Sequence, residues 1–281
     1  MAIPVYTSMV KILLFGSRGY LGEQFQKLYP HALCPKMDIA DAKGVAEILE
    51  CEKPDVVINA AGKTGRPNID WCETHKEETV HSNVLGPLVL LEECMKRKTY
   101  LVHLSSGCIY EGDNHGKGFS ENDPPNFAGS FYSRTKAWID MLLSEFPVLI
   151  LRLRMPFDGS RNERNLIMKL AKYPKVLDVK NSLTYLPDLL VTAKNLIKKK
   201  KTGVYHVVNP GNISPYEVML RYKEMVDPSH TVERLTLQDL GTVVQAGRSN
   251  CILSTAKLES EGIRLQPLDK ALNEAFRMLK M

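Results

Sequence analysis

Short runs of branched apolar residues alternate along the chain with longer stretches of helical periodicity. A continuous apolar run bounded by small or polar residues is typical of a strand buried on both faces. Strands that alternate with helices in this way form a parallel sheet covered on both sides. The sequence therefore predicts an α/β, Rossmann-like, doubly wound fold with a smaller C-terminal lobe, and its expected strands are 10–15, 55–59, 99–104, 149–154 and 203–208.

Glycines follow the first predicted strand at the spacing Gly-x-x-Gly-x-x-Gly, just ahead of a helical stretch. Glycine permits a tight turn and a close approach of a pyrophosphate, and the helix start supplies amide donors. The spacing differs from the commoner Gly-x-Gly-x-x-Gly, and a plain strand-to-helix turn is the alternative. We expect this segment to bind a dinucleotide through Gly16, Ser17, Arg18, Gly19, Tyr20, Leu21 and Gly22, on a helix beginning near Leu21.

The region after a short predicted strand at 32–34 bears on the choice of cofactor. An acidic residue there usually binds the ribose of NAD. Here Lys36 occupies this neighbourhood and Arg18 lies in the glycine loop, so two cations favour NADPH, with NADH left open. Asp38, followed by Ile39, could instead face the adenine.

Small and polar residues end the next predicted strand and mark the expected helix over 73–98. Small side chains are needed where backbone packs against a cofactor. We expect cofactor contacts from this part of the chain at Asn59, Ala60, Ala61, Gly62 and Asn83.

Tyr132 and Lys136 are four residues apart at the start of a helical pattern that runs to Phe146, so both face the same way. A phenol donates protons poorly near neutral pH unless a cation stabilises its phenolate, and Lys136 can supply that cation. Ser106 ends a predicted strand, where ligands of open α/β sheets bind. A half-buried tyrosine and a solvated lysine are the alternative for the pair taken alone.

Composition sets the remaining bounds. The chain has 281 residues, 44% hydrophobic and 25% charged, with a net charge of +5 that suits an anionic small ligand and does not require nucleic acid. Six scattered cysteines without a secretory signal indicate reduced intracellular thiols, and no apolar run reaches membrane-spanning length. No metal site is expected. We expect an extension at 1–8, a dinucleotide-binding domain at 9–155 with a return segment near 184–208, and a substrate lobe at 156–183 and 209–281.

The ordered motifs resemble the extended short-chain dehydrogenases/reductases over nearly the whole chain. Longer segments resemble the nucleotide-rhamnose synthase epimerase-reductases and their relatives, the dTDP-4-dehydrorhamnose reductases, and these segments are 60–73, 107–109, 125–132 and 248–250. The resemblance implies a bifunctional 3,5-epimerase/4-reductase of rhamnose biosynthesis. Such an enzyme is cytoplasmic and converts a UDP- or dTDP-4-keto-6-deoxyglucose to the rhamnose nucleotide with NAD(P)H.

The resemblance also implies roles for particular residues. Tyr132 is the implied proton donor, Lys136 its electrostatic partner and ribose ligand, and Ser106 the group that polarises the carbonyl. Cys108 and Lys169 are implied for epimerisation at C3 and C5. The segments matched to the family, and the position of Arg248 in the C-terminal lobe, give the expected substrate contacts Thr64, Gly65, Arg66, Asn68, Ser106, Asn165 and Arg248. Fold-level analogy adds a homodimer formed through helices 73–98 and 132–146.

Three alternatives remain open at this stage. The chain could be a reductase alone, with Cys108 as a small buried hydrophobe and Lys169 as a helix surface charge. It could be a non-catalytic subunit similar to the regulatory chain of methionine adenosyltransferase. The shorter loop after Tyr110 could alter access to the pocket without removing a catalytic group.

Overall fold

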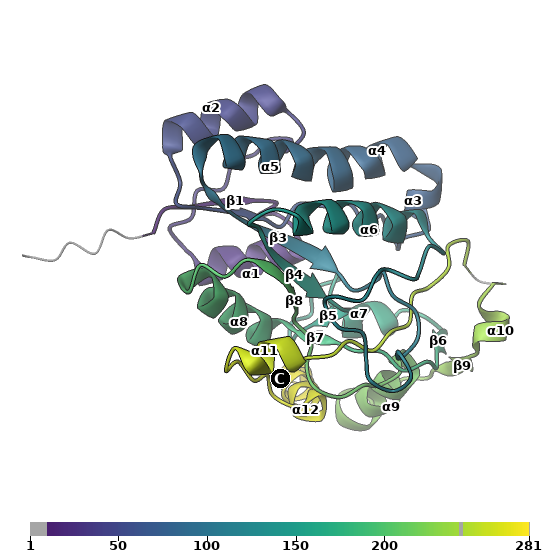
Figure 1. Cartoon of the computed structure of the whole chain (residues 1–281). Helices are drawn as coiled ribbons and strands as arrows, with labels where there is room; N and C mark the ends of the chain where they lie inside the picture. Colours follow the sequence, from purple (N-terminus) through teal and green to yellow (C-terminus); the bar gives the residue numbers. More distant parts are fainter. Residues whose placement is uncertain (1–9, 242–243, 281) are drawn as a thin grey trace, which may run out of the picture.

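The centre of the protein is a five-stranded parallel sheet with strand order β1-β2-β3-β4-β8 (Figure 1). The computed structural model describes residues 10–241 and 244–280, so the predicted extension at 1–8 lies outside it. The strands are β1 (Ile12–Phe15), β2 (Val56–Asn59), β3 (Tyr100–Ser106), β4 (Leu149–Leu153) and β8 (Gly203–His206). Each expected apolar run forms one of these strands.

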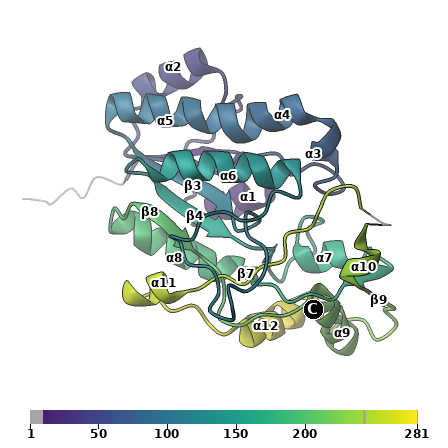
Figure 2. The same cartoon turned by 45° about the vertical axis from the view of Figure 1, so that its right-hand side comes forward.

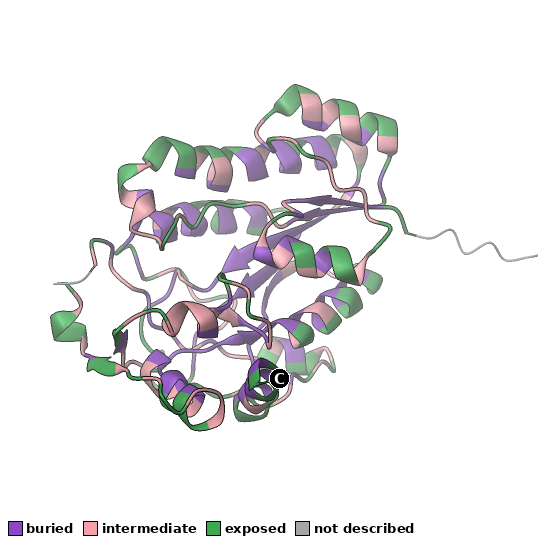
Figure 3. Ribbon diagram, turned by 180° about the vertical axis from the view of Figure 1, so that it is seen from behind, coloured by how far each residue is buried: buried purple, intermediate pink, exposed green. Residues whose placement is uncertain are grey.

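Helices cover both faces of this sheet, as the apolar runs require. On one face α1 (Tyr20–Leu28) and α8 (Leu186–Lys198) enclose a core with the strands. On the other face α2 (Ala42–Glu52), α5 (Gly86–Arg97) and α6 (Phe131–Ser144) enclose a second core. Seen from behind, the strands are buried between these layers (Figure 3). The doubly wound α/β prediction is confirmed.

The strand predicted at 32–34 is reduced to a single bridge, so that prediction was too generous. Leu33 pairs with Leu13 of β1, donating to Ile12 O at 2.9 Å and accepting from Leu14 N at 2.8 Å. Pro35 follows almost at once, and a proline has no N–H with which to continue the ladder. Because Leu33 and β2 lie on opposite sides of β1, the chain reverses direction across the sheet at β1, where open α/β sheets bind ligands.

The helix predicted over 73–98 is interrupted. It comprises α3 (Trp71–Thr74), α4 (Lys76–Val80), a π-helical turn η1 (His81–Leu85) and α5. His75 departs from helical geometry between α3 and α4, with φ −122° and ψ 55°. Pro87 in the first turn of α5 cannot donate to the carbonyl of Asn83, which favours a local change of hydrogen-bond register.

Smaller elements gather on the side of the sheet away from α2 and α5 (Figures 1 and 2). Two short parallel pairs form there, β5 (Pro156–Phe157) with β7 (Thr184–Tyr185) and β6 (Lys175–Leu177) with β9 (Glu233–Leu235). The helices are α7 (Leu166–Leu170), α9 (Pro215–Met225), α10 (Leu237–Leu240), α11 (Ala256–Ser260) and α12 (Leu268–Lys280). Of these elements, β5, β6, β7, α7, α9 and α12 share an apolar core of their own, and the division of the chain into two domains stays a prediction.

A buried ion pair fixes α6 against the sheet. Arg152 of β4 and Asp140 of α6 are 4% and 0% exposed, and Arg152 Nη2 lies 2.5 Å from Asp140 Oδ1. The Ser105 hydroxyl donates to Asp140 Oδ2 at 2.6 Å, and Arg152 Nη1 donates to the Tyr110 hydroxyl at 2.8 Å. The helix that carries Tyr132 is thereby tied to β3 and β4.

Replacing Asp140 by asparagine should destabilise the protein by about 3–5 kcal/mol, because it leaves the Arg152 guanidinium buried without its counter-charge. Urea unfolding followed by circular dichroism measures this change. Glu92→Gln is the matched control, since its pair with Lys96 on α5 is exposed to solvent. Equal unfolding midpoints for Asp140→Asn and the control would mean that the buried pair does not hold α6.

Candidate active site

The glycine loop forms a tight turn between β1 and α1. Gly16 has φ +78°, and a Cβ there would lie 2.4 Å from Ala61 N. A Cβ on Gly22 would lie 2.0 Å from the Gly16 carbonyl oxygen. Gly19 caps the N-terminus of α1, which begins at Tyr20, one residue before the expected start. The backbone cradle and the helix N-terminus fit a bound pyrophosphate.

Two buried asparagines shape the opposite wall of this cradle. Asn59 Oδ1 accepts from Ala61 N at 3.0 Å, and its amide lies 3.1 Å from His103 Nδ1. Asn83, presented by η1, accepts from Lys63 N at 2.7 Å and donates to Lys63 O at 2.9 Å. Both side chains hold the segment between them in position, which keeps its backbone close to Gly16.

The polar residues expected near the adenosine lie at the rim. Asp38 binds His81 Nε2 at 2.8 Å and accepts from Ala40 N at 2.9 Å, and this backbone hydrogen bond lowers its pKa despite some burial. Arg18 and Lys36 are exposed. Ile39 is buried against α5, where a Cβ on Gly86 would lie 2.4 Å from Ile39 Cγ1.

Ser106, Tyr132 and Lys136 come together at the carboxyl end of β3. Ser130 caps α6 by accepting from Ser133 N at 3.1 Å, which sets the first helical turn that presents Tyr132. The Ser106 hydroxyl lies close enough to the Tyr132 phenol to oppose the rise in its pKa. Lys136 Nζ lies beside Gly62, 3.6 Å from where a Cβ on that glycine would be.

Burial controls the ionisation of this group. It raises the pKa of the Tyr132 phenol, and the neighbouring Cys108 sulfur adds to the rise, so the phenol carries its proton near neutral pH. Burial lowers the pKa of Lys136 to about 8, opposed by the charges of Asp140 and Cys108. Ser106 and Arg154 favour the Tyr132 phenolate, a role that the sequence assigned to Lys136.

Cys108 contacts Ser106, and its charge acts on Lys169, which comes from a distant part of the chain. The Cys108 backbone N–H donates to Ser106 Oγ at 3.1 Å, and its sulfur accepts from Arg154 Nη1 at 2.8 Å. Lys169 on α7 is partly buried, which lowers its pKa; Arg164 adds to that fall and Cys108 opposes it.

The expected substrate residue Arg248 is held by an acidic partner. Arg248 Nη1 donates to Asp70 Oδ1 and to Ala246 O, both at 2.8 Å, and Nη2 lies 3.3 Å from Asn68 Oδ1. Ala246 N also donates to Asp70, at 3.0 Å. The C-terminal segment is therefore docked on the loop ahead of α3.

Other expected substrate residues lie around this contact or beneath it. Arg66 pairs with Glu163 at 3.4 Å, and Thr64 is exposed. Gly65 has φ +70°, and its Cβ would meet Trp71. Asn165 is fully buried as the cap of α7, accepting from Ile167 N and donating to Asp158, so it orients the helix of Lys169.

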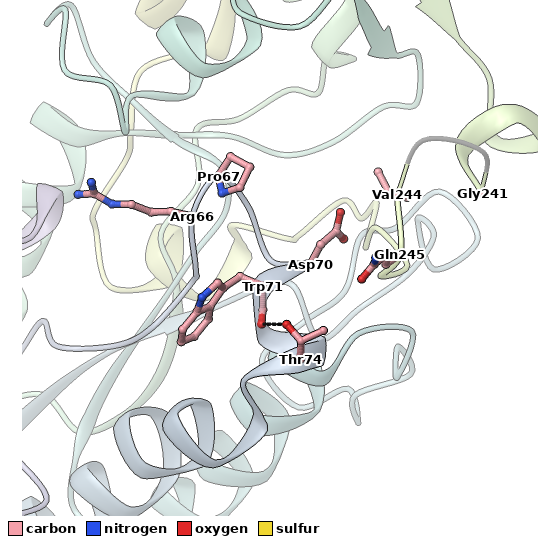
Figure 4. Close-up of a pocket in the computed structure, with 8 residues that line it drawn as sticks. All are labelled: Arg66, Pro67, Asp70, Trp71, Thr74, Gly241, Val244 and Gln245. Carbon is pink, nitrogen blue, oxygen red and sulfur yellow. Dashed lines mark hydrogen bonds between the residues drawn. The ribbon is translucent and has the colours of Figure 1, made fainter.

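A hollow of about 590 Å³ lies beside these loops (Figure 4). Asp70, Trp71 and Thr74 line one side of it, and Val244 and Gln245 from the C-terminal segment line the other. Loops from the two halves of the chain therefore face each other next to the Arg248–Asp70 contact.

Two arginines at the carboxyl end of β4 were not identified as site residues from the sequence, Arg152 within the strand and Arg154 directly after it. Arg152 and Arg154 are each 4% exposed, and both contact polar groups at the carboxyl edge of the sheet. The signal was present, because two charges at alternate positions of an apolar strand need buried partners. Their partners come from segments too distant in sequence to be foreseen.

Within residues 10–241 and 244–280, no group of three or more histidine, cysteine, aspartate or glutamate side chains is placed to hold a metal ion. None of the helices in those ranges is both long and apolar enough to cross a membrane.

The fold and the Ser106–Tyr132–Lys136 group define a Rossmann-like reductase of the short-chain dehydrogenase/reductase type. Residues 10–281 match the RmlD substrate binding domain family, and the chain belongs to it.

Relatives of known sequence and structure agree with this family. A bifunctional dTDP-4-dehydrorhamnose 3,5-epimerase/dTDP-4-dehydrorhamnose reductase of Arabidopsis thaliana is 39% identical, over 95% of this chain and 92% of the relative. A trifunctional UDP-rhamnose-forming enzyme of the same plant, RHM1, is 36% identical, and the match spans 41% of its length. The L780 UDP-rhamnose synthase of Acanthamoeba polyphaga mimivirus superimposes with a TM-score of 0.91, at 32% identity over 96% of this chain and 99% of that one.

Replacing Gly19 by valine should weaken NADPH binding more than about tenfold while the protein stays folded, since a tight loop admits no side chain next to a pyrophosphate. Its Cβ would meet only the Gly16 carbonyl oxygen, at 3.3 Å. Fluorescence titration and thermal unfolding measure the two effects. Gly22→Ala is the contrast, because its Cβ would overlap the backbone and should lower the unfolding temperature as well. Unchanged NADPH affinity in Gly19→Val would remove the loop from the cofactor site.

Proposed function

We propose that this protein is a bifunctional 3,5-epimerase/4-reductase that converts a UDP- or dTDP-4-keto-6-deoxyglucose into the corresponding rhamnose nucleotide with NADPH. The observation that supports the proposal is that Cys108 contacts Ser106 beside Tyr132, while the charge of Cys108 acts on Lys169. Reduction needs only Ser106, Tyr132 and Lys136. A thiol and an amine at the same centre supply acid–base groups for a second reaction.

In the proposed reduction, Ser106 and Tyr132 hold the C4 oxygen of the sugar and Tyr132 protonates it. Burial keeps the phenol protonated until it is needed, which suits a general acid. NADPH, when bound, supplies the hydride that reaches C4. The Lys136 ammonium binds the cofactor ribose, and Ser106 and Arg154 favour the phenolate left on Tyr132.

In the proposed epimerisation, Cys108 and Lys169 exchange protons at C3 and C5. Both carbons flank the C4 ketone, so loss of either proton moves negative charge onto the C4 oxygen. Ser106 and Tyr132 stabilise that enolate through the hydrogen bonds that also prepare the ketone for reduction. One set of donors therefore serves both half-reactions.

The charges at the rim of the site suit the anionic ligands. Arg18 and Lys36 are exposed near the glycine loop and support NADPH over NADH. Arg248 is proposed to bind the nucleotide diphosphate, since a guanidinium forms bidentate contacts with phosphate. In the free protein it is paired with Asp70, so the diphosphate competes with that carboxylate.

The proposal also covers the oligomeric state of the protein and its location in the cell. Four large apolar side chains on or next to α6 are exposed, which supports a homodimer formed through this helix, and they are Trp138, Met141, Leu142 and Phe146. All six cysteines are unpaired, which fits the reducing cytoplasm.

Solvent deuterium tests the epimerase activity. In D₂O with UDP-4-keto-6-deoxyglucose and no NADPH, the wild type should introduce deuterium at C3 and C5, detected by NMR. Cys108→Ala and Lys169→Ala should abolish this exchange, yet each should still reduce a substrate that is already epimerised, since hydride transfer needs neither group. The wild type given NADPH should release the rhamnose nucleotide.

The same experiment separates the alternatives. A wild type that reduces the epimerised substrate without any exchange is a reductase only. A protein that neither exchanges nor reduces, and that co-purifies stoichiometrically with a synthetase, fits a regulatory subunit instead.

Tyr132→Phe should lose reduction by about 10²–10⁴-fold while binding the substrate unchanged, because the ring remains and only the acidic proton is gone. Single-turnover oxidation of NADPH measures the loss. Exchange at C3 and C5 should weaken less, since Ser106 still holds the enolate. Near-full reduction in this variant would assign the proton to another group.

A further inference from the structure

Arg154 is a buried guanidinium that contacts the sulfur of Cys108. It follows the last residue of β4 and is 4% exposed. Its Nη1 donates to Cys108 Sγ at 2.8 Å, and its Nη2 donates to Asn181 Oδ1 at 2.6 Å and to the carbonyl of Ser249. Three segments far apart in sequence thus fix the plane of the guanidinium against the thiol.

The charge of Arg154 is not balanced by a carboxylate among the described residues. Among the described residues no carboxylate pairs with it, and its buried Nε has no hydrogen-bond partner. Arg152, two residues earlier, is paired with Asp140. A buried charge without a counter-charge is costly, so Arg154 favours a negative charge on whichever neighbour can ionise. Of the three groups that accept from it, only Cys108 can.

We propose that Arg154 is a positioning residue that holds Cys108 as a thiolate and aims it at the sugar, making Cys108 the base of epimerisation. The inference rests on the proposed epimerase activity. The thiolate takes a proton from C3 or C5 and becomes a thiol, while the electron pair of the broken C–H bond moves onto the C4 oxygen. Lys169, as its ammonium, returns a proton to the carbon and becomes an amine, and a proton then passes from the thiol to solvent and from solvent to the amine.

Other ionisable groups face Cys108 and do not replace Arg154. They are Tyr132 and Lys136 on α6, Lys169 on α7 and Cys251. Tyr132 and Cys251 are acids and cannot compensate a thiolate. Lys136 has Asp140 as its first opposing charge, and burial lowers the pKa of Lys169. The Arg154 guanidinium is the cation in hydrogen-bond contact with the sulfur. Burial lowers the pKa of this guanidinium, but the Cys108 and Cys251 sulfurs raise it, and its pKa is raised overall.

The contacts of Arg154 also reach the substrate residues. Ser249, whose carbonyl accepts from it, directly follows Arg248, and Asn181 donates to Asn250 Oδ1 at 3.0 Å. A diphosphate that moves Arg248 would therefore pull on the backbone that orients Arg154.

Alkylation of Cys108 tests the proposal without relying on activity. Iodoacetamide is added to the full chain between about pH 6 and about pH 9, where thiols change from protonated to thiolate form, and labelling is followed peptide by peptide in a mass spectrometer. Arg154→Gln, which keeps a donor but loses the charge, should slow labelling of Cys108 near neutral pH by about tenfold. Labelling of Cys51, an exposed thiol, is the internal control and should not change.

Arg154→Lys is the conservative variant and keeps the cation without the planar fork. Its labelling rate should lie between those of the wild type and Arg154→Gln, and it carries the test if the glutamine variant fails to fold. Both variants should lose deuterium exchange at C3 and C5 by about tenfold or more while retaining more of the reduction of an epimerised substrate.

The outcomes are distinct. Wild-type labelling of Cys108 in both variants overturns the role of Arg154, whatever the enzyme does. Slower labelling together with a wild type that exchanges no deuterium keeps Arg154 as the partner of the thiolate and removes the epimerase function. Equal losses of reduction and exchange, with labelling unchanged, assign Arg154 a structural role.

Discussion

Two buried guanidinium groups at the carboxyl end of β4 determine how this site is built. A parallel sheet covered on both faces leaves no room for solvated charge, so Arg152 and Arg154 each require partners from other parts of the chain. Arg152 takes Asp140 from α6 and the hydroxyl of Tyr110. This pair fixes the position of α6, which carries Tyr132 and Lys136, next to the end of β3, where Ser106 lies.

Arg154 ties segments of the C-terminal half of the chain to the end of β4. Its contacts with Asn181 and Ser249 bring two distant segments to the end of β4, and its contact with Cys108 turns the thiol toward the same place. Residues two apart on a strand point to the same side, and at the end of the strand both arginines reach groups beyond the sheet. The chemistry and the docking of the C-terminal segment therefore both depend on the carboxyl end of β4, where Arg152 is in the strand and Arg154 directly follows it.

Much of this arrangement could be predicted from the sequence, because it depends on local patterns. The apolar runs predicted the strands, and the glycines predicted the turn after β1. The four-residue spacing of Tyr132 and Lys136 predicted that both lie on one face of a helix. What local patterns could not give is the pairing of groups far apart in sequence, such as Arg248 with Asp70 or Arg154 with Cys108. The break in the helix at His75 was missed, and so was η1, which depends on a proline whose effect falls one turn earlier. Asn165 was read as a substrate contact, whereas its buried amide caps α7, and any contact with substrate stays a prediction.

The burial that the fold imposes acts in opposite directions on the two kinds of acid at this centre. It raises the pKa of the Tyr132 phenol and lowers that of the Lys136 and Lys169 ammonium groups, because in each case the charged form loses hydration. In the proposed reduction, the neutral phenol is the form that donates a proton to the C4 oxygen. A lysine with a lowered pKa gives up its proton more readily than one in water. The Cys108 sulfur has a different kind of neighbour, since it accepts a hydrogen bond from the buried guanidinium of Arg154. One pocket can therefore contain a proton donor for reduction and a base for epimerisation without either group neutralising the other.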